Sequence, residues 1–256
     1  MALLATTGTW FVTALGASVV FFFKNTKQEK MDLLLGFSAG VMIAASFWSL
    51  LEPAVASAEA HLRSPAWLIV GIGFLSGAAL MRLSDAALTQ LQQRSGTENK
   101  GSRLSMLMLS ITLHNFPEGL AVGVAFGALH AEGYPPERIM GVVSIALGIA
   151  LQNFPEGAAV SLPMRREGHG RFRSFLAGQA SALVEPLGGF LGALAVVRMQ
   201  ALLPFALSFA AGAMILVTVH ELIPTCSASQ QEHPYRATMS VLLGFTIMML
   251  LDVALG

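Results

Sequence analysis

Residues 114–119 read HNFPEG and residues 152–157 read QNFPEG, so one six-residue pattern occurs twice and changes only at its first position. Each copy lies inside a long apolar stretch. Imidazoles and carboxylates inside a membrane helix are costly and usually functional. The repetition predicts a pair of helices that build one polar site together.

The rest of the chain has the composition of an integral membrane protein. Of its 256 residues, 54% are hydrophobic and only 12% are charged, whereas a soluble domain carries about 25% charged residues. The net charge is zero, which gives a nucleic-acid partner no electrostatic support. The single cysteine, Cys226, excludes a disulfide framework and cysteine-rich metal sites. The sequence therefore predicts an all-α polytopic membrane protein embedded in a lipid bilayer.

Apolar runs between charged or proline-rich breaks predict eight transmembrane helices in one domain, residues 1–256. The first run, 2–23, lacks the basic region and cleavage site of a signal peptide and is expected to be a span. The expected spans are 5–23, 32–51, 66–88, 104–128, 139–162, 174–196, 201–222 and 237–255. Lys and Arg concentrate in the connections 1–2, 3–4 and 5–6, so the positive-inside rule places both termini outside the cytoplasm.

Two parts of the chain resemble each other. FSAGVMIAAS (37–46) aligns with FAAGAMILVT (209–218), and a nearly equal shift lays Gly73 and Phe74 on Gly244 and Phe245. Spans 1–3 (5–88) therefore match spans 6–8 (174–255) in opposite orientation, around the central spans 4–5 (104–162). This pattern predicts a 3+2+3 inverted-repeat bundle, which is typical of transporters with a site near the membrane midplane. Several spans have a face of small residues, which could support a homodimer.

The two motifs predict a metal site. Residues four apart share a helix face, so His114 projects with Glu118 and Gln152 with Glu156, while Asn115 and Asn153 adjoin them. No Lys or Arg occurs in spans four and five, so a metal ion or protons must compensate the carboxylates. Imidazole, carboxylate and amide oxygen suit zinc and similar divalent transition metals.

Other residues have two readings each. Glu185, before Pro186, is either a ligand or a carboxylate paired at a helix end. Met42 is either a thioether ligand or core packing. His220 and Glu221 form either a secondary station on the ion path or a polar cluster at a helix end. Their HELIP segment lacks the second histidine of H-E-x-x-H, which excludes a zinc protease.

The two motifs, GVM in span two and VEPLGG in span six resemble the ZIP family of divalent-metal transporters, and in particular its prokaryotic GufA-like branch. The resemblance covers all eight spans. It implies transport of zinc into the cytoplasm, and of cadmium, iron or manganese. Short connections favour a bacterial inner membrane.

The resemblance also implies a two-metal centre between spans four and five. One metal would be bound by Met42, His114, Glu118, Gln152 and Glu156. The adjoining metal would be bound by Asn115, Glu118, Asn153, Glu156 and Glu185, with both motif glutamates bridging. Asn153 stands where some relatives have a carboxylate, which removes a charge and leaves the occupancy of the second position open.

Two other functions compete with a metal importer. A divalent-cation exchanger or exporter would use the same carboxylates; calcium exchangers favour all-oxygen sites, whereas export depends on gradients that the ligands do not reveal. An intramembrane metalloenzyme would need a positioned base and an open metal position. No partner histidine or nucleophile set accompanies the motifs, so we expect no enzyme.

Overall fold

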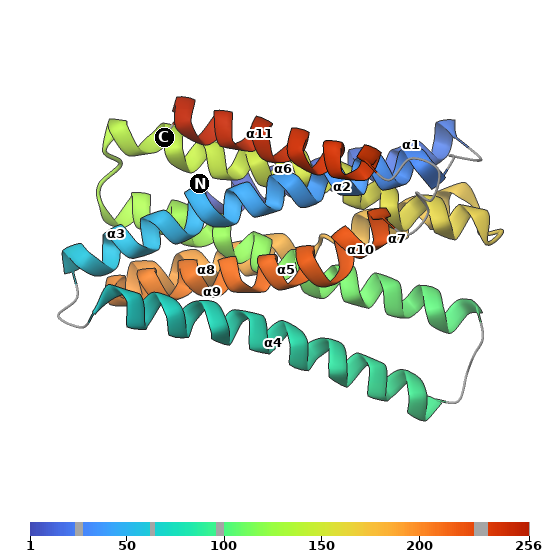
Figure 1. Ribbon diagram of the computed structural model, residues 1–256, viewed down its shortest axis with the longest axis horizontal. Coiled ribbons are helices and arrows are strands. Elements are labelled where there is room, and N and C mark those ends of the chain that lie inside the picture. Colours follow the sequence, from blue (N-terminus) through green and yellow to red (C-terminus); the bar gives the residue numbers. More distant parts are fainter. Residues whose placement is uncertain (24–27, 62–64, 96–99, 228–234, 256) are drawn as a thin grey trace.

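The computed structural model describes residues 1–23, 28–61, 65–95, 100–227 and 235–255, and this part of the chain contains helices and no strands. Long helices run side by side along one axis (Figure 1). They are α1 (Ala2–Phe22), α2 (Gln28–Ala44), α4 (Ala66–Ser95), α5 (Lys100–Ala131), α6 (Pro136–Arg166), α8 (Val184–Arg198), α9 (Leu203–Val217) and α11 (Tyr235–Leu255). Shorter elements extend or join them: η1 (Ala45–Leu51), α3 (Glu52–His61), α7 (Arg171–Ala180), η2 (Gln200–Leu202), η3 (Thr218–Leu222) and α10 (Ile223–Ser227).

The lengths and composition of the helices confirm an all-α polytopic membrane protein. Within the described residues, seven segments are long and apolar enough to cross a membrane: 2–22, 29–60, 66–87, 136–166, 171–198, 203–226 and 235–255. Helix α5 coincides with the remaining expected span and has 32 residues. At about 1.5 Å per residue it is about 48 Å long, which exceeds the hydrocarbon thickness of about 30 Å.

Three expected spans are not continuous α-helices. Span six, expected at 174–196, consists of α7 and α8, because a turn at 181–183 interrupts it. The Ser181 hydroxyl donates to the Gly178 carbonyl, and Pro186 in the first turn of α8 has no N–H to continue a preceding helix. Spans two and seven contain the π-helical turns η1 and η3.

The helices pack in four long pairs: α5 with α8, α1 with α6, α4 with α9, and α2 with α11. Motif glycines allow the closest approach. A Cβ on Gly119 would overlap the Glu185 main chain, and one on Gly157 would overlap the Thr13 carbonyl. Because glycine lets helix backbones come into contact, α8 and α1 press against the two motifs and bring their own polar side chains to them.

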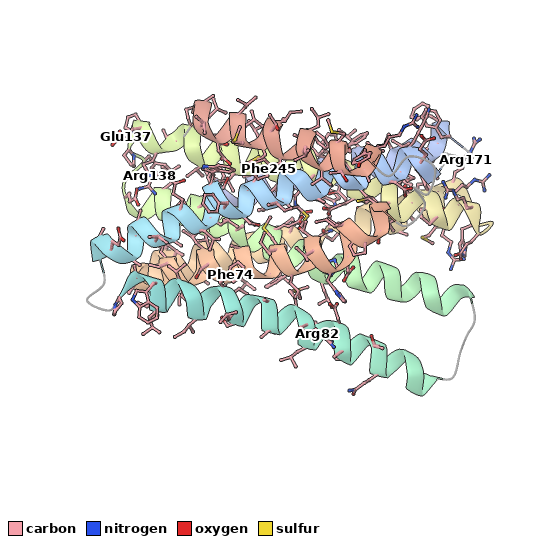
Figure 2. All side chains as sticks on the ribbon, in the orientation of Figure 1. Phe74, Arg82, Glu137, Arg138, Arg171 and Phe245 are labelled. Carbon is pink, nitrogen blue, oxygen red and sulfur yellow. The ribbon has the colours of Figure 1, made fainter. Side chains whose placement is uncertain are left out.

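The two ends of the bundle differ in what they carry. The marked N- and C-termini lie toward the same end as the α5–α6 connection (Figure 1). Figure 2 shows Glu137 and Arg138 at that end and Arg171 at the other. Of the basic residues used to predict sidedness, Lys24 and Lys27 lie outside the described residues.

Candidate metal centre

The two motifs lie within α5 and α6, which stay helical through Pro117 and Pro155. The structure buries the four side chains expected to form the core of the site. His114 and Glu156 are each 7% exposed, and Glu118 and Gln152 have no exposed surface. Asn115 and Asn153 are equally buried. The helices therefore bring two carboxylates, an imidazole and three amides into the interior of the bundle.

Glu118 has the least compensated side chain of this set. Neither of its oxygens has a hydrogen-bond partner among the described residues. The amide of Gln152 lies close by without reaching hydrogen-bonding geometry, and the charges of Glu156 and Glu185 also act on Glu118. Both polar atoms of Asn115 are buried and without a partner as well. Buried polar groups are normally hydrogen-bonded, and an uncompensated buried charge is costly, so these carboxylates need compensation, either by a bound cation or by protons.

Glu156 has one polar neighbour from α2. The hydroxyl of Ser38 lies 3.3 Å from Glu156 Oε1 and 3.4 Å from the main-chain carbonyl of Gln152. Ser38 is fully buried. Ser38 was not predicted as a site residue, because a serine among small residues of an apolar helix has no distinguishing pattern.

His114 contacts an acid that the sequence analysis had paired with His220. Its Nε2 atom lies 3.1 Å from Glu221 Oε1. Asp85 of α4 joins them, and ligand atoms of these three residues all lie within 4.8 Å of one another. Asp85 was not predicted as a site residue, because its spacing of three from Arg82 suggests an ion pair within its own helix. His220 is exposed and outside this group.

Met42 lies at the same centre. It is 1% exposed, and the Thr218 hydroxyl lies 3.5 Å from its Sδ atom. Thr218 also donates to the Met214 carbonyl at 2.8 Å, within its own helix. The thioether therefore borders the polar cluster, where a soft metal ion would contact it.

Glu185 has a different environment from Glu118, although neither has exposed surface. The Asn153 amide nitrogen lies 2.9 Å from both Glu185 oxygens. Thr9 donates to Oε2, and the Thr13 hydroxyl lies 3.5 Å from Oε1. The carboxylate is therefore surrounded by donors from α1 and α6.

A cavity of about 200 Å³ adjoins the centre. Met42, His114, Glu118, Glu156 and Glu221 line its inner part. Other lining residues belong to the start of α2, the end of α6 and α10: Met31, Leu35, Pro163, Arg166 and Thr225. The cavity thus extends from the motifs toward the end of the bundle at which α6 ends.

Comparison with known proteins also indicates a site for metal ions, as the buried ligands do. The family model described as ZIP Zinc transporter matches residues 101–252. The chain is 37% identical to Zinc transporter ZIP11 of Homo sapiens, over 100% of this chain and 97% of that protein. It is 34% identical to Zinc transporter GufA of Myxococcus xanthus, over 95% and 94%, and 35% identical to Zinc transporter ZIPB of Bordetella bronchiseptica, over 95% and 78%.

The chain belongs to the ZIP zinc-transporter family. As a ZIP protein it is a multi-pass membrane protein that transports metal ions, and it is not an enzyme. The expected relation to the GufA-like branch is confirmed.

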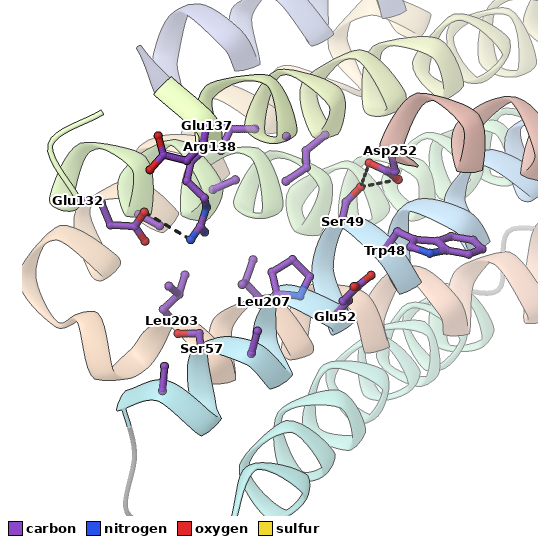
Figure 3. Close-up of a pocket in the computed structure, with 18 of the residues that line it drawn as sticks. Trp48, Ser49, Glu52, Ser57, Glu132, Glu137, Arg138, Leu203, Leu207 and Asp252 are labelled. Carbon is purple, nitrogen blue, oxygen red and sulfur yellow. Dashed lines mark hydrogen bonds and ion pairs between the residues drawn. The ribbon is translucent and has the colours of Figure 1, made fainter. Parts of the chain in front are cut away.

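A larger cavity, of about 590 Å³, lies at the opposite end of this ZIP protein. Asp252 accepts a hydrogen bond there from Ser49 at 2.9 Å, and Glu132 pairs with Arg138 at 3.5 Å (Figure 3). Ser144 also donates to Asp252, at 2.7 Å. Between this cavity and the motifs, α5, α6 and α9 contribute buried apolar residues: Ala121, Val122, Ile149 and Met214. An apolar layer therefore separates the two cavities.

Proposed function

We propose that this ZIP protein carries zinc across the membrane into the cytoplasm through two adjoining metal positions between α5 and α6. Cadmium, iron and manganese are further candidate substrates. The observation that carries the proposal is Glu118, a fully buried carboxylate with no hydrogen-bond partner in the described structure, beside a cavity. A divalent ion supplies the positive charge that this buried carboxylate needs for compensation.

The first position is formed by Met42, His114, Glu118, Gln152 and Glu156. Imidazole, carboxylate and thioether donors together favour zinc and cadmium, whereas calcium and magnesium prefer oxygen ligands alone. The relatives are themselves named as zinc transporters. The second position adds Asn115, Asn153 and Glu185, and shares both motif glutamates with the first.

A secondary metal path leads away from the first position. Glu221 and Asp85 lie against His114, so an ion that leaves the motifs meets a second set of ligands next to them. His220 is exposed beside Glu221 and extends this path toward the outside of the bundle.

The distribution of basic residues supports the direction of transport. The cavity beside the motifs extends toward the end of the bundle that carries Arg165 and Arg166 of α6 and Arg171 and Arg173 of α7. The positive-inside rule assigns this end to the cytoplasm. The larger cavity and both termini then face outward, and the cavity beside the motifs is the route of release.

Helix contacts support the 3+2+3 inverted repeat. Gly16 of α1 contacts the Phe154 carbonyl of α6, and Gly188 of α8 contacts the Phe116 carbonyl of α5. Gly188 follows Gly16 by 172 residues and Phe154 follows Phe116 by 38. The duplication that relates spans 1–3 to spans 6–8 and span 4 to span 5 therefore converts one of these contacts into the other. The same duplication relates the α5–α8 pair to the α1–α6 pair, and the α4–α9 pair to the α2–α11 pair. Such repeats move against each other in alternating access.

For the third span, the contacts favour a different register from the sequence match. Gly77 of α4 approaches the Phe209 carbonyl, and Gly244 of α11 approaches the Phe37 carbonyl. Phe209 follows Phe37 by 172 residues, so Gly77 is the counterpart of Gly244, at a distance of 167 residues. The sequence match had paired Gly73 with Gly244, which is one helical turn away.

The test is metal uptake by the purified protein in proteoliposomes, with zinc compared against cadmium, manganese and calcium. We expect zinc and cadmium uptake that Glu118→Ala and Glu156→Ala each abolish, and no calcium uptake. Glu59→Ala, which changes an exposed glutamate of α3, is the control. Uptake that survives both motif substitutions would contradict the proposal.

A further inference from the structure

The amide of Asn153 has a fixed orientation in this structure. Its nitrogen lies 2.9 Å from each oxygen of Glu185 and 3.2 Å from the Thr9 carbonyl. Both amide hydrogens therefore have acceptors, and all the groups involved are buried. Rotating the amide by half a turn would place its oxygen against a carboxylate and a carbonyl, which repel it. An amide nitrogen cannot bind a metal ion, so Asn153 presents a donor on the side where Glu185 lies.

Glu185 has several donors without any ion. Besides Asn153, it accepts a hydrogen bond from Thr9, and the Thr13 hydroxyl lies 3.5 Å from its other oxygen. Hydrogen bonds to a charged group contribute about 1.5–3 kcal/mol each, and they stabilise the carboxylate in place. A second ion that used Glu185 as a ligand would have to break the contacts with the Asn153 amide.

The main chain holds these donors in position. Gly119 lets the backbone of α8 contact α5 at Glu185, and Gly157 lets the backbone of α1 contact α6 at Thr13. The glycines of the two motifs thus bring Glu185 and the threonine face of α1 to the same place. Thr9 and Thr13 are buried, at 2% and 0% exposed, so their hydroxyls cannot exchange these contacts for water.

The opposite side of the cluster lacks such donors. Glu118 and the Oδ1 atom of Asn153 are buried and without hydrogen-bond partners in the described part of the chain. The need for a cation is therefore on the side of Glu118, and Asn153 turns its free oxygen away from Glu185.

We propose that the Asn153 amide takes the place of a second metal ion beside Glu185, so that this ZIP protein binds one divalent ion at the twin motifs. The inference rests on the proposed function: of the two adjoining positions described there, only the one on the side of Glu118 holds an ion in this chain. Glu185 is then a positioning residue that orients Asn153 and anchors α8, while the ion is bound on the side of Glu118.

The test counts cadmium ions. Purified protein is stripped with chelator, loaded with Cd²⁺, freed of excess ion and measured for its metal-to-protein ratio. Glu118→Ala, measured in parallel, gives the cadmium bound elsewhere. We expect one Glu118-dependent ion per wild-type chain. Asn153→Asp replaces the donor with a carboxylate, and we expect two Glu118-dependent ions in this variant.

The possible results separate the two proposals. Two Glu118-dependent ions in the wild type would overturn the one-ion inference and leave the proposed function intact. No Glu118-dependent cadmium in the wild type would overturn both. One ion in both the wild type and Asn153→Asp would overturn the role assigned to Asn153.

A second measurement uses the wild-type protein alone. It is therefore independent of any folding defect that the two adjacent carboxylates cause in Asn153→Asp. Crystals of the wild-type protein soaked in Cd²⁺ give anomalous peaks at bound ions. We expect one peak between α5 and α6, with Glu185 still bonded to Asn153 and Thr9. Two peaks between these helices, or a peak bound to Glu185, would overturn the inference.

Discussion

Glu118 and Glu185 are both fully buried glutamates at the same centre, but their surroundings are opposite. Glu118, in the middle of α5, has no hydrogen-bond partner among the described residues. Glu185, in the first turn of α8, is approached by Asn153, Thr9 and Thr13. Burial alone therefore does not identify a metal ligand. The supply of donors distinguishes a carboxylate that needs an ion from one that the protein already stabilises.

The largest expected effect comes from removing the carboxylate without donors. Glu118→Ala should lower zinc uptake at least about 100-fold, because changes even to the groups around a metal ligand cost about 10–100-fold. It should not lower the melting temperature of the metal-free protein, because the lost charge had no partner. Uptake in proteoliposomes and thermal unfolding in detergent measure the two effects. Strong destabilisation by Glu118→Ala would mean that Glu118 has a structural partner and would erase the contrast with Glu185.

The carboxylate with donors should behave in the opposite way. Glu185→Ala leaves one of the two Asn153 amide hydrogens without an acceptor, at a cost of about 1–3 kcal/mol for a buried group. The other amide hydrogen keeps the Thr9 carbonyl, and the Thr9 hydroxyl keeps the Thr6 carbonyl. Thermal unfolding of metal-free Glu185→Ala beside Glu118→Ala measures the difference. An unchanged melting temperature for Glu185→Ala would show that its hydrogen bonds contribute little to the fold.

The two glutamates also mark what the sequence could predict. The number and type of helices follow from apolar runs, and the motif residues follow from their four-residue spacing inside those runs. Glu118 was recognisable because an acid without a nearby Lys or Arg in its span needs compensation. Glu185 looked the same in sequence, since its donors come from residues 9, 13 and 153. Side-chain contacts between distant segments leave no local pattern.

The missed residues have the same cause. Asp85 meets His114 only because α4 packs against α5, and Ser38 meets Glu156 only because α2 packs against α6. The division of span six into α7 and α8 was also missed, since Pro186 is compatible with the first turn of a helix as well as with a kink. A relation between residues can be predicted when it is local along a helix, and most of this centre is not.

A smaller effect tests the contact that holds Glu185 in place. Gly119→Ala inserts a Cβ into the Glu185 main chain, so α8 must move away from α5. We expect a loss of about 1–3 kcal/mol, as for other overpacked sites, measured by thermal unfolding. Gly8→Ala is the matched control, because a Cβ there meets nothing within 4 Å, and alanine in a helix should be neutral or stabilise by about 0.5–1 kcal/mol. Equal melting temperatures for the two variants would contradict the tight α5–α8 contact.

The smallest expected effect concerns Glu156, which lies between the two extremes because it has one donor. Ser38 lies 3.3 Å from Glu156 Oε1 and 3.4 Å from the Gln152 carbonyl. Its one hydrogen is shared between two acceptors, so it contributes less than an unshared hydrogen bond to a charged group, which contributes about 1.5–3 kcal/mol. Ser38→Ala should therefore raise the half-saturating zinc concentration about 2–10-fold and leave the maximal rate largely unchanged, since the ligand itself remains. Ser208→Ala is the control, because Ser208 is equally buried and its hydroxyl bonds only to carbonyls of its own helix. If Ser38→Ala lowers zinc uptake as much as Glu118→Ala does, Ser38 contacts the ion directly. If Ser38→Ala and Ser208→Ala give identical uptake curves, the single donor from Ser38 does not distinguish Glu156 from Glu118.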